Sequence, residues 1–506
     1  MTRHDLTLIV GAEDRDTQHG VRDLAHLIDG AWVASSTGET FERLSPATGR
    51  MASRAAKGGV AEVDAAVASA RAAFPLWSDW PGAKRAKLLS RVADLIDGRR
   101  GKLALHETLE SGKPIAQAEA EIAGAADIWR YAATLAWNIR GDSQNALGPD
   151  MLGMVLKVPV GVVSIITPWN FPFLIVSQKL PFALAAGCTA VVKPSEMTSA
   201  TTVMLGEVLV EAGLPAGVVN IVLGYGDPVG QRMVTHPDVA MVSFTGSTQV
   251  GKAIVRAASG SLKKVSLELG GKNPQVIFPD ADLEAAADAI VFGTFFNAGE
   301  CCNAGSRILV HADVAADLSA RIVALSRRVP FGDPLSPATK VGALISPDHA
   351  SKIDGYVKAA AAAGAEVMLG GDPLEIDGLA GSFYGPTIVS GVRPEMPIAS
   401  EEVFGPVLSI LTFSTFEEAV ALANGAAYGL SAGVWSENIH TCVSFARRVE
   451  AGTVWTNTWM DGYPELPFGG VKESGLGREL GPNGIEEFLE PKTVQMRVGK
   501  TRQNWV

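Results

Sequence analysis

Short apolar runs alternate with helical patterns between residues 161 and 269, and this alternation constrains the fold more than any other feature. The apolar runs are about five residues long, which is the usual length of a buried strand. The expected strands are 161–166, 189–193, 218–222, 240–244 and 264–269. The expected helices between them are 172–186, 199–212, 228–234 and 248–258. Elements in this order form parallel βαβ units with right-handed crossovers, so the segment predicts an α/β fold with a Rossmann-like sheet.

A helical region precedes this sheet and a second α/β region follows it. Residues 60–136 are rich in Ala, Arg, Leu and Glu at helical spacing, which predicts several amphipathic helices. The second region is expected to contain helices 283–296 and 350–363 and strands near 306–310, 407–413 and 433–435. Residues 484–496 read as a short helix followed by a strand, which can extend the sheet of a neighbouring subunit.

The composition is that of a globular protein with large cores, and it excludes several classes of function. Of the 506 residues, 47% are hydrophobic and 19% are charged, and the length suits about three domains. The formal charge of -11 argues against a nucleic-acid partner, which needs a basic surface. The 4 cysteines and 8 histidines are not spaced as a disulfide framework or a metal site. The sequence therefore predicts a cytoplasmic protein without a bound metal.

No membrane association is expected. Residues 158–176 carry no charge, but Pro159, Pro168 and Pro172 would leave backbone groups unpaired in lipid. A buried strand, a loop and the start of a helix explain this segment better. The first 26 residues lack the apolar core of a secretory signal.

A glycine-rich turn at 246–253 follows an expected strand and opens an expected helix. The free N–H groups and the positive dipole end at such a turn bind phosphate. The turn nearly matches a P-loop, but Ala253 lacks the hydroxyl that would hold magnesium. A dinucleotide is therefore favoured over a nucleoside triphosphate, with a plain strand–helix turn as the alternative. Lys193 and Glu196 follow another strand, where a ribose would lie, although a solvated loop fits them equally well.

Three further residues suit covalent chemistry on a carbonyl group. Cys302 lies among small, turn-compatible residues, so a substrate can approach its thiol; the alternative is a buried structural cysteine. Glu268 interrupts an expected strand, where a carboxylate needs a task or a partner. Asn170 lies between two prolines and offers an amide donor from a rigid loop, with a helix cap as the alternative. Together they are a candidate nucleophile, base and oxyanion donor.

An ordered series of motifs over residues 27–494 resembles the aldehyde dehydrogenase superfamily. The motifs are Pro-Trp-Asn-Phe-Pro at 168–172, Lys-Pro-Ser-Glu at 193–196, Phe-Thr-Gly-Ser at 244–247, Leu-Glu-Leu-Gly-Gly-Lys at 267–272, Gly-Glu-Cys-Cys at 299–302, Glu-Glu-Val-Phe-Gly-Pro-Val at 401–407 and Pro-Phe-Gly-Gly at 467–470. The resemblance implies that an aldehyde is oxidised to the acid with NAD, or with NADP as the alternative. It also implies a Rossmann-like cofactor domain, a second α/β catalytic domain and a small β oligomerisation element.

By this resemblance, Cys302 is the nucleophile, Glu268 is the base that activates water, and Asn170 with the Cys302 N–H forms the oxyanion hole. Relatives that pass the acyl group to coenzyme A lack the carboxylate at Glu268, so hydrolysis is favoured. Glu300 stands where the family has Gln, which can alter the local charge. The implied cofactor-binding residues are Ile166, Thr167, Trp169, Lys193, Glu196, Gly246, Ser247, Leu269, Glu402 and Phe404.

The substrate is less constrained than the reaction. The segment 457–468 looks like the betaine-aldehyde and amino-aldehyde branch, in which Trp459 would face a cation. The alternative for Trp459 is an aromatic side chain packed beneath a loop. Many of those relatives have an aromatic residue where Gln178 stands, so an anionic or a neutral polar aldehyde stays open. The implied substrate pocket consists of Phe171, Gln178, Cys301, Asn303, Trp459 and Phe468.

The resemblance also implies how the chain is divided and assembled. A homotetramer or homodimer is expected, acting on a small-molecule aldehyde. A P-loop NTPase is disfavoured by Ala253, and a non-catalytic member is disfavoured by the presence of both Cys302 and Glu268. The expected parts are an N-terminal extension at 1–26, an NAD-binding domain at 27–140 and 160–267, a catalytic domain at 268–483, and an oligomerisation element at 141–159 and 484–506.

Overall fold

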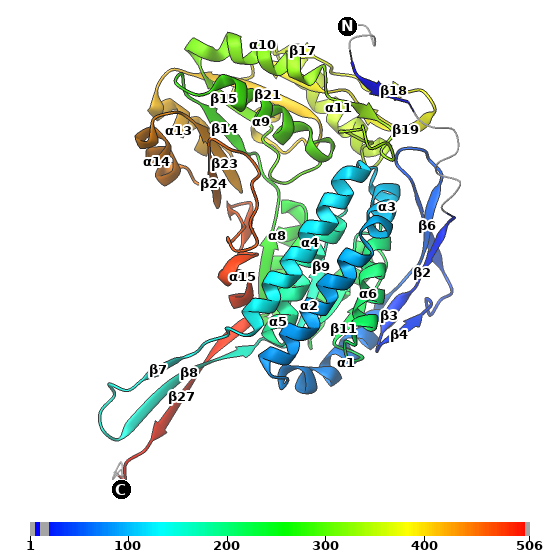
Figure 1. Cartoon of the computed structure of the whole chain (residues 1–506), viewed down its shortest axis with the longest axis vertical. Coiled ribbons are helices and arrows are strands. Elements are labelled where there is room, and N and C mark those ends of the chain that lie inside the picture. The colour runs from blue at the N-terminus through cyan, green and yellow to red at the C-terminus, as the bar shows by residue number, and fades with distance from the viewer. Residues whose placement is uncertain (1–5, 11–19, 501–506) are drawn as a thin grey trace.

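A computed structural model describes residues 6–10 and 20–500 of the chain, which form two large sheets and a small projecting one (Figure 1). The first large sheet has the strand order β26-β13-β12-β9-β10-β11-β3-β4. Strands β9 to β13 are parallel to one another, while β26, β3 and β4 join the two edges antiparallel. Their bounds are β3 His26–Ile28, β4 Ala31–Val33, β9 Val162–Ile166, β10 Thr189–Lys193, β11 Val219–Ile221, β12 Met241–Thr245, β13 Lys264–Glu268 and β26 Gly475–Leu476.

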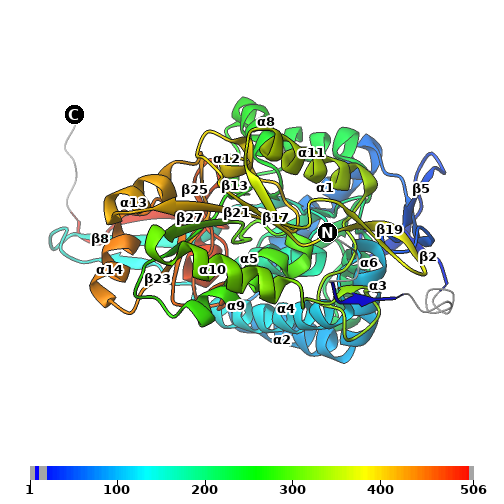
Figure 2. The same ribbon diagram turned by 90° about the horizontal axis from the view of Figure 1, so that it is seen from above.

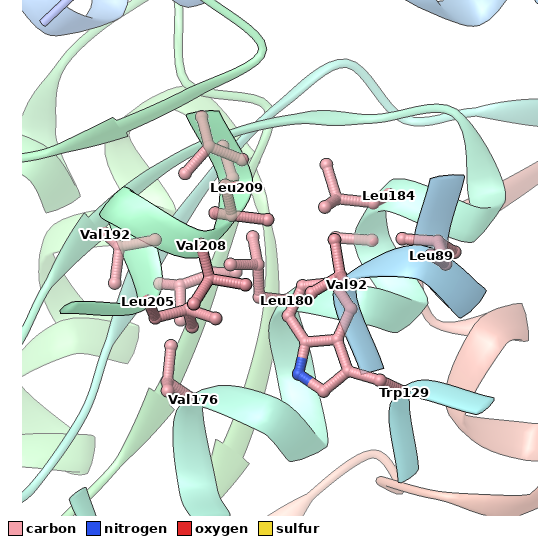
Figure 3. Packing of buried hydrophobic residues seen from close by; sticks show 14 of the residues in the cluster. Leu89, Val92, Trp129, Val176, Leu180, Leu184, Val192, Leu205, Val208 and Leu209 are labelled. Carbon is pink, nitrogen blue, oxygen red and sulfur yellow. The ribbon is translucent and has the colours of Figure 1, made fainter. Parts of the chain in front are cut away.

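Helices cover both faces of this sheet, which explains why its strands are apolar throughout. Side chains on β10 alternate between the two faces. Val192 packs with Val176 and Leu205 in one core (Figure 3), and Val191 belongs to a core on the other face. The helices are α1 Val60–Ser78, α2 Gly82–Gly98, α3 Arg100–Ser111, α4 Ile115–Ala136, α5 Pro172–Ala186, α6 Ala200–Ala212, α7 Gln231–Thr235 and α8 Thr248–Ala258.

The second large sheet has the order β17-β20-β21-β15-β14-β23-β24 and is parallel except at β17. Figure 2 shows α9 and α10 on one side of this sheet and α11 on the other. The strands are β14 Pro274–Ile277, β15 Arg307–His311, β17 Glu366–Leu369, β20 Thr387–Ser390, β21 Val407–Phe413, β23 Ser431–Trp435 and β24 Thr453–Thr456. The helices are α9 Leu283–Phe295, α10 Ala315–Ser326, α11 Pro347–Ala362, α12 Pro397–Ser400, α13 Phe416–Asn424 and α14 Ile439–Arg448. The last helix, α15 Gly481–Glu486, packs instead against α5 of the first region.

The third sheet projects from the body as an arm (Figure 1). It has the order β27-β8-β7, with bounds Leu489–Arg497, Met151–Pro159 and Asp142–Gln144. β27 pairs antiparallel with β8 along its whole length, from Leu489 opposite Pro159 to Arg497 opposite Met151. The arm therefore combines segments from the middle and the end of the chain.

The remaining short strands pair with one another in small sheets outside the two large ones. β1 (Leu8–Ile9) pairs with β16 (Phe331–Gly332), so part of the N-terminal extension lies on the second α/β region. The remaining strands are β2 Arg22–Leu24, β5 Thr40–Leu44, β6 Met51–Ala56, β18 Pro373–Ile376, β19 Leu379–Tyr384, β22 Tyr428–Gly429 and β25 Val471–Lys472. In the part of the chain that the structure describes, no helix is both long and apolar enough to cross a membrane.

The expected elements agree with this architecture, with a few differences at their ends. Helices 172–186 and 248–258 have the predicted bounds. The helix expected at 350–363 begins at Pro347, because Ser346 caps it by accepting a hydrogen bond from the His349 N–H at 3.2 Å. The helix expected at 228–234 is a wide turn at Gly226–Gly230 followed by α7.

Candidate active site

The carboxyl ends of β12 and β13 open onto a cavity of about 560 Å³, which β24 of the second sheet and the first turns of α5 also border. Such a position, outside the carboxyl ends of parallel strands, is where α/β sheets bind ligands. The cavity brings a thiol and a carboxyl group together. The predicted site residues that line it are Phe171, Gln178, Glu268, Cys301, Cys302, Asn303 and Phe468.

Cys302 follows a turn of left-handed backbone. After α9 ends at Phe295, the φ angles of Asn297, Ala298 and Gly299 are 51°, 55° and 71°. This conformation costs a residue with a side chain roughly 1–3 kcal/mol, so the surrounding contacts must hold the turn. The turn delivers Cys302 to the cavity wall, where its side chain is half-buried.

The surroundings of the Cys302 thiol favour its protonated form. A hydrogen bond with Cys301 is the largest cause that holds the pKa of the thiol well above its ordinary value, followed by burial and by the charges of Glu402 and Glu268. The Cys302 backbone carbonyl accepts a hydrogen bond from Asn273 Nδ2 at 2.8 Å, which fixes the main chain. Because the thiolate is the nucleophilic form, the site needs a group that removes the thiol proton.

Asn170 lies between β9 and α5, and hydrogen bonds hold it against the turn that precedes Cys302. Its Nδ2 donates to the Glu300 carbonyl at 3.0 Å, and Asn297 Nδ2 donates to the carbonyls of both Asn170 (3.1 Å) and Glu300 (3.0 Å). Phe171 occupies the N-cap position of α5, so the interpretation of Asn170 as the helix cap is wrong. The role of its amide as an oxyanion donor stays a prediction.

Glu268 is the last residue of β13 and is only 4% exposed. Neither of its oxygens has a hydrogen-bond partner among the residues that the structure describes. Burial is the main cause that raises the pKa of Glu268 well above its usual value; Glu479 adds to the rise, and Lys179 and Arg478 oppose it. A Cβ on Gly469 would lie 2.5 Å from Glu268 Oε1, so glycine leaves the carboxyl group its space. A carboxyl group with a raised pKa is suited to proton transfer near neutral pH.

The residues predicted to bind the adenosine half of a dinucleotide lie at the carboxyl ends of neighbouring strands. Lys193 ends β10 and is in register with Ile166, which ends β9. Lys193 Nζ lies 3.5 Å from Glu196 Oε2, and burial lowers the pKa of the lysine. The buried hydroxyls of Thr167 and Thr245 have no partner within the described residues. The edge therefore offers free polar groups for a ligand.

The glycine-rich turn has the expected strand–turn–helix context. Ser247 caps α8 by accepting a hydrogen bond from the Val250 N–H at 3.4 Å. At Gly246 a Cβ would lie 2.4 Å from the Phe244 ring, and at Gly251 it would lie 2.6 Å from the side chain of Leu269. Glycine thus keeps the first turn of α8 close to the sheet, in the arrangement that suits a pyrophosphate.

The residues predicted for the nicotinamide half form a second group. Glu402 Oε1 accepts a hydrogen bond from the Gly271 N–H at 3.0 Å, and burial raises the pKa of Glu402 to about 7. Phe404 has a left-handed φ of 59°, and its carbonyl lies 2.6 Å from His349 Nε2. Its ring meets that of Trp169 edge-on, with centroids 5.4 Å apart. This contact joins the Asn170 loop to the Glu402 loop, so the residues present fit a dinucleotide.

Comparison with known proteins decides the family. The model of the aldehyde dehydrogenase family matches residues 32–494. The chain belongs to the aldehyde dehydrogenase family. It is 41% identical to the betaine aldehyde dehydrogenase of Bacillus subtilis (strain 168) over 481 residues, which cover 94% of this chain and 98% of that relative.

Solved structures of other aldehyde dehydrogenases confirm the expected fold. The NAD-dependent aldehyde dehydrogenase from Sinorhizobium meliloti matches with a TM-score of 0.97 at 48% identity, over 99% of both chains. The betaine aldehyde dehydrogenase from Staphylococcus aureus, in complex with NAD+, matches with a TM-score of 0.93 at 38% identity, over 95% of this chain and 96% of that one.

The structure places Trp459 behind the wall of the cavity. It is 4% exposed, and a Cβ on Gly293, Gly305 or Gly433 would lie between 2.4 and 2.9 Å from its indole ring. Its ring contacts that of Trp455, with centroids 4.8 Å apart, and Trp455 lines the cavity. The alternative of an aromatic side chain packed beneath a loop therefore describes Trp459, and Trp455 supplies the aromatic surface.

Glu300, which stands where other aldehyde dehydrogenases have Gln, does not line the cavity. Its Oε1 accepts a hydrogen bond from the Ile345 N–H at 2.9 Å and lies 3.8 Å from His349 Nε2. Burial raises the pKa of Glu300 well above its usual value, against the opposing effects of Lys113 and Arg43. The raised pKa favours the neutral acid, which has the same charge as the family's amide.

Several residues of the site were not predicted from the sequence. Lys179 pairs with Glu479, and both side chains are buried. A lysine within the otherwise uncharged helix 172–186 was the available signal that a buried partner exists. The loop 458–466 reaches the cavity only through the topology of the second sheet, which no local pattern reveals. The cavity residues missed include Leu174, Ile175, Phe296, Trp455, Thr458, Met460, Asp461, Tyr463, Leu466 and Glu479.

Proposed function

We propose that the protein oxidises an aldehyde to the carboxylic acid with NAD, through a covalent adduct on Cys302. The observation that carries this proposal is the shared cavity of a half-buried thiol and a buried carboxyl group that lacks a hydrogen-bond partner. A cysteine of the Staphylococcus aureus relative is modified by BME in another solved structure, which supports a reactive thiol in this family.

The first bond forms between Cys302 and the aldehyde. Ionised Glu268 takes the thiol proton, the sulfur attacks the carbonyl carbon, and the π electrons of the carbonyl move to its oxygen. Asn170 Nδ2 and the Cys302 N–H donate hydrogen bonds to that oxyanion, which is why Asn170 is held so firmly. NAD, bound along the strand ends, supplies the acceptor for the hydrogen and two electrons that the carbon then loses.

Hydrolysis of the resulting thioester completes the reaction. Glu268, once it has released the first proton, removes a proton from water, and the hydroxide attacks the thioester carbon. The C–S bond breaks, which releases the acid and returns the Cys302 thiolate. Both proton transfers require ionised Glu268, so the reaction accelerates as the pH rises through the raised pKa of this group.

For the substrate, we propose an aldehyde with a cationic group, with betaine aldehyde as the leading candidate. The charged residues that line the described cavity are Glu268, Asp461 and Glu479, and no Lys, Arg or His joins them. Glu479 is paired with Lys179 and the pKa of Glu268 is raised, so Asp461 is the carboxylate whose charge disfavours an anionic aldehyde. Trp455 and Tyr463 add aromatic surface on which a quaternary ammonium group can rest. The Bacillus subtilis relative acts on betaine aldehyde by name, which supports the same choice. A neutral aldehyde is the second candidate, since Gln178 supplies no aromatic ring.

We also propose that the arm is the oligomerisation element of a cytoplasmic homotetramer or homodimer. Its exposed apolar residues, which include Leu147, Leu156 and Val498, support an interface there. The predicted NAD-binding and catalytic domains correspond in this proposal to the first and second large sheets. Light scattering of the intact protein tests the assembly, and a monomer at all concentrations would refute it.

A panel of three aldehydes with NAD and with NADP tests the reaction and the substrate together. Betaine aldehyde, its uncharged isostere 3,3-dimethylbutanal and anionic succinate semialdehyde are compared by following nicotinamide reduction. We expect betaine aldehyde to exceed the isostere in kcat/KM by about tenfold or more, because a desolvated cation–π contact contributes about 2 kcal/mol. The anion should be the poorest substrate. If no aldehyde reduces NAD or NADP, the proposed function is wrong.

A further inference from the structure

Three ionisable side chains are buried where α3 meets α4, beside the residue that follows Asn170. Lys113 Nζ lies 3.0 Å from Glu107 Oε1 and also pairs with Glu121 Oε2. The side chains of Lys113, Glu107 and Glu121 are 1%, 0% and 4% exposed. The same ammonium group lies 4.2 Å from the centroid of the Phe171 ring. Buried ion pairs add little to the stability of a fold, so the place where this cluster lies indicates its role.

Glu121 also binds the helix that Asn170 precedes. Its Oε1 accepts a hydrogen bond from the Leu174 N–H at 3.0 Å. Leu174 lies in the first turn of α5, where N–H groups have no partner within the helix. The pair of Lys113 and Glu121 therefore contacts the Phe171 ring and the Leu174 N–H, one and four positions after Asn170.

The first turn of α4 reaches Asn170 by a second route. Gln117 Oε1 accepts a hydrogen bond from the Asn297 N–H at 3.2 Å, and Asn297 Nδ2 donates to the Asn170 carbonyl at 3.1 Å. Gln117 Nε2 in turn donates to the Lys340 carbonyl at 2.6 Å, which connects the turn to the second α/β region. The first turns of α4 therefore contact both segments of the chain that meet at the proposed oxyanion hole, the loop with Asn170 and the turn with Asn297.

We propose that Lys113 and Glu121 are positioning residues that set the side-chain amide of Asn170 toward the oxyanion. This inference rests on the proposed function of Asn170. Neither Lys113 nor Glu121 lines the cavity itself, but Phe171 and Leu174, which they contact, do, so the test has to separate an effect on aldehyde binding from an effect on the Asn170 amide. A displacement of about 1 Å in a reacting group can cost about 100-fold in rate, so a modest shift of this loop is measurable.

The test compares Glu121→Ala, Glu121→Gln and the control Glu107→Gln. Glu107 contacts Lys113, and burial and the charge of Glu121 raise its pKa well above the usual value; Gln there keeps the shape of the side chain and an oxygen that can accept a hydrogen bond from Lys113. We expect Glu121→Ala to lower kcat about 10-fold to 50-fold while the aldehyde KM and the NAD dissociation constant change less than about 2-fold. Glu121→Gln should recover most of the loss, because its amide oxygen still accepts from Leu174. Glu107→Gln should match the unaltered protein.

A double-mutant cycle with Asn170→Ala separates positioning from general structure. In the Asn170→Ala background, we expect Glu121→Ala to lower kcat by less than about 2-fold further, because the amide that Glu121 orients is gone. An equal loss in both backgrounds would show that Glu121 acts independently of Asn170 and would overturn the proposal. Normal turnover of Asn170→Ala alone would instead refute the oxyanion role in the proposed function.

Glu121→Asp keeps the test decisive if Glu121→Ala does not fold. The shorter side chain retains the negative charge beside Lys113 but cannot span the same distance to Leu174. We expect the same fall in kcat and the same lack of additivity with Asn170→Ala. Full turnover of Glu121→Asp, with a normal unfolding midpoint, would overturn the positioning role.

Discussion

Lys179 on α5 and Glu479 before α15 form a buried ion pair, and both of its charges act on Glu268. The negative partner raises the pKa of Glu268 and the positive partner lowers it. The two ends of the pair therefore have opposite effects on the pH at which the proposed base ionises.

Replacing either partner should move the acidic limb of the kcat/KM–pH profile. Glu479→Gln removes the charge that raises the Glu268 pKa, so the limb should move to lower pH by about one unit. Lys179→Met removes the opposing charge, so the limb should move to higher pH. Profiles of both variants over pH 5 to 10 check the signs. Shifts in the same direction would contradict the assignment of Glu268 as the titrating group.

Asn170→Ala should lower turnover by about 100-fold to 1,000-fold, the usual effect of removing one oxyanion donor. Binding of NAD should persist, because the predicted cofactor contacts come from other side chains. Steady-state kinetics and a fluorescence titration with NAD measure the two properties. Near-normal turnover would count against the role of this amide.

Glu268→Gln should separate the two halves of the reaction. Hydrolysis loses its base, so NADH should appear in a burst of about one equivalent per site and then form slowly. The burst should be slow at neutral pH and faster at high pH, where the Cys302 thiol ionises without help. Rapid mixing at several pH values measures both phases. Unchanged steady-state turnover would mean that another group activates water.

Glu300→Gln should stabilise the protein at alkaline pH. The folded-state pKa of Glu300 is raised above its unfolded value of 4.5, so its contribution to stability is complete below that value and is lost as the pH rises. Gln carries no charge at any pH, and its carbonyl can still accept from the Ile345 N–H. The gain in unfolding midpoint should be small at pH 5 and grow toward pH 8, by roughly 1 °C for each kcal/mol of added stability in a chain of this length. A gain that is equal at both pH values would contradict the raised pKa.

Asp461→Asn should reduce the preference for cationic aldehydes. The substitution removes a carboxylate from the cavity wall and keeps the size of the side chain. We expect kcat/KM for betaine aldehyde to fall by about 3-fold to 10-fold, which corresponds to about 1 kcal/mol, while 3,3-dimethylbutanal is unaffected. An equal loss for both aldehydes would show that Asp461 shapes the cavity without selecting charge.

The parallel core could be predicted from the sequence because its signals are local. Each strand of the first sheet is a short apolar run, and each helix has its own start and stop residues, so 172–186 and 189–193 were placed to the residue. Cys302 was singled out by its small, turn-compatible neighbours and Glu268 by its place within an expected strand, and the motifs then pointed to both.

Contacts between distant segments could not be predicted in the same way. Trp459 packs closely against three glycines, which come from α9, the segment before β15 and β23. Lys179 and Glu479 are separated by 300 residues, and Glu121 and Leu174 by 53. Such pairs depend on how the two sheets are brought together, and a single sequence contains no local pattern for that.

Glu268 ends a strand of the first sheet, whereas Cys302 belongs to the segment that leads into β15 of the second. The proposed base and nucleophile are thus carried by separate hydrophobic cores. On heating, activity should consequently be lost through a small displacement of one core relative to the other, before either core loses its helical structure. To raise the temperature at which this protein stays active, stabilising substitutions belong at the interface between the two cores. Substitutions that stabilise one core alone would leave the temperature of inactivation unchanged.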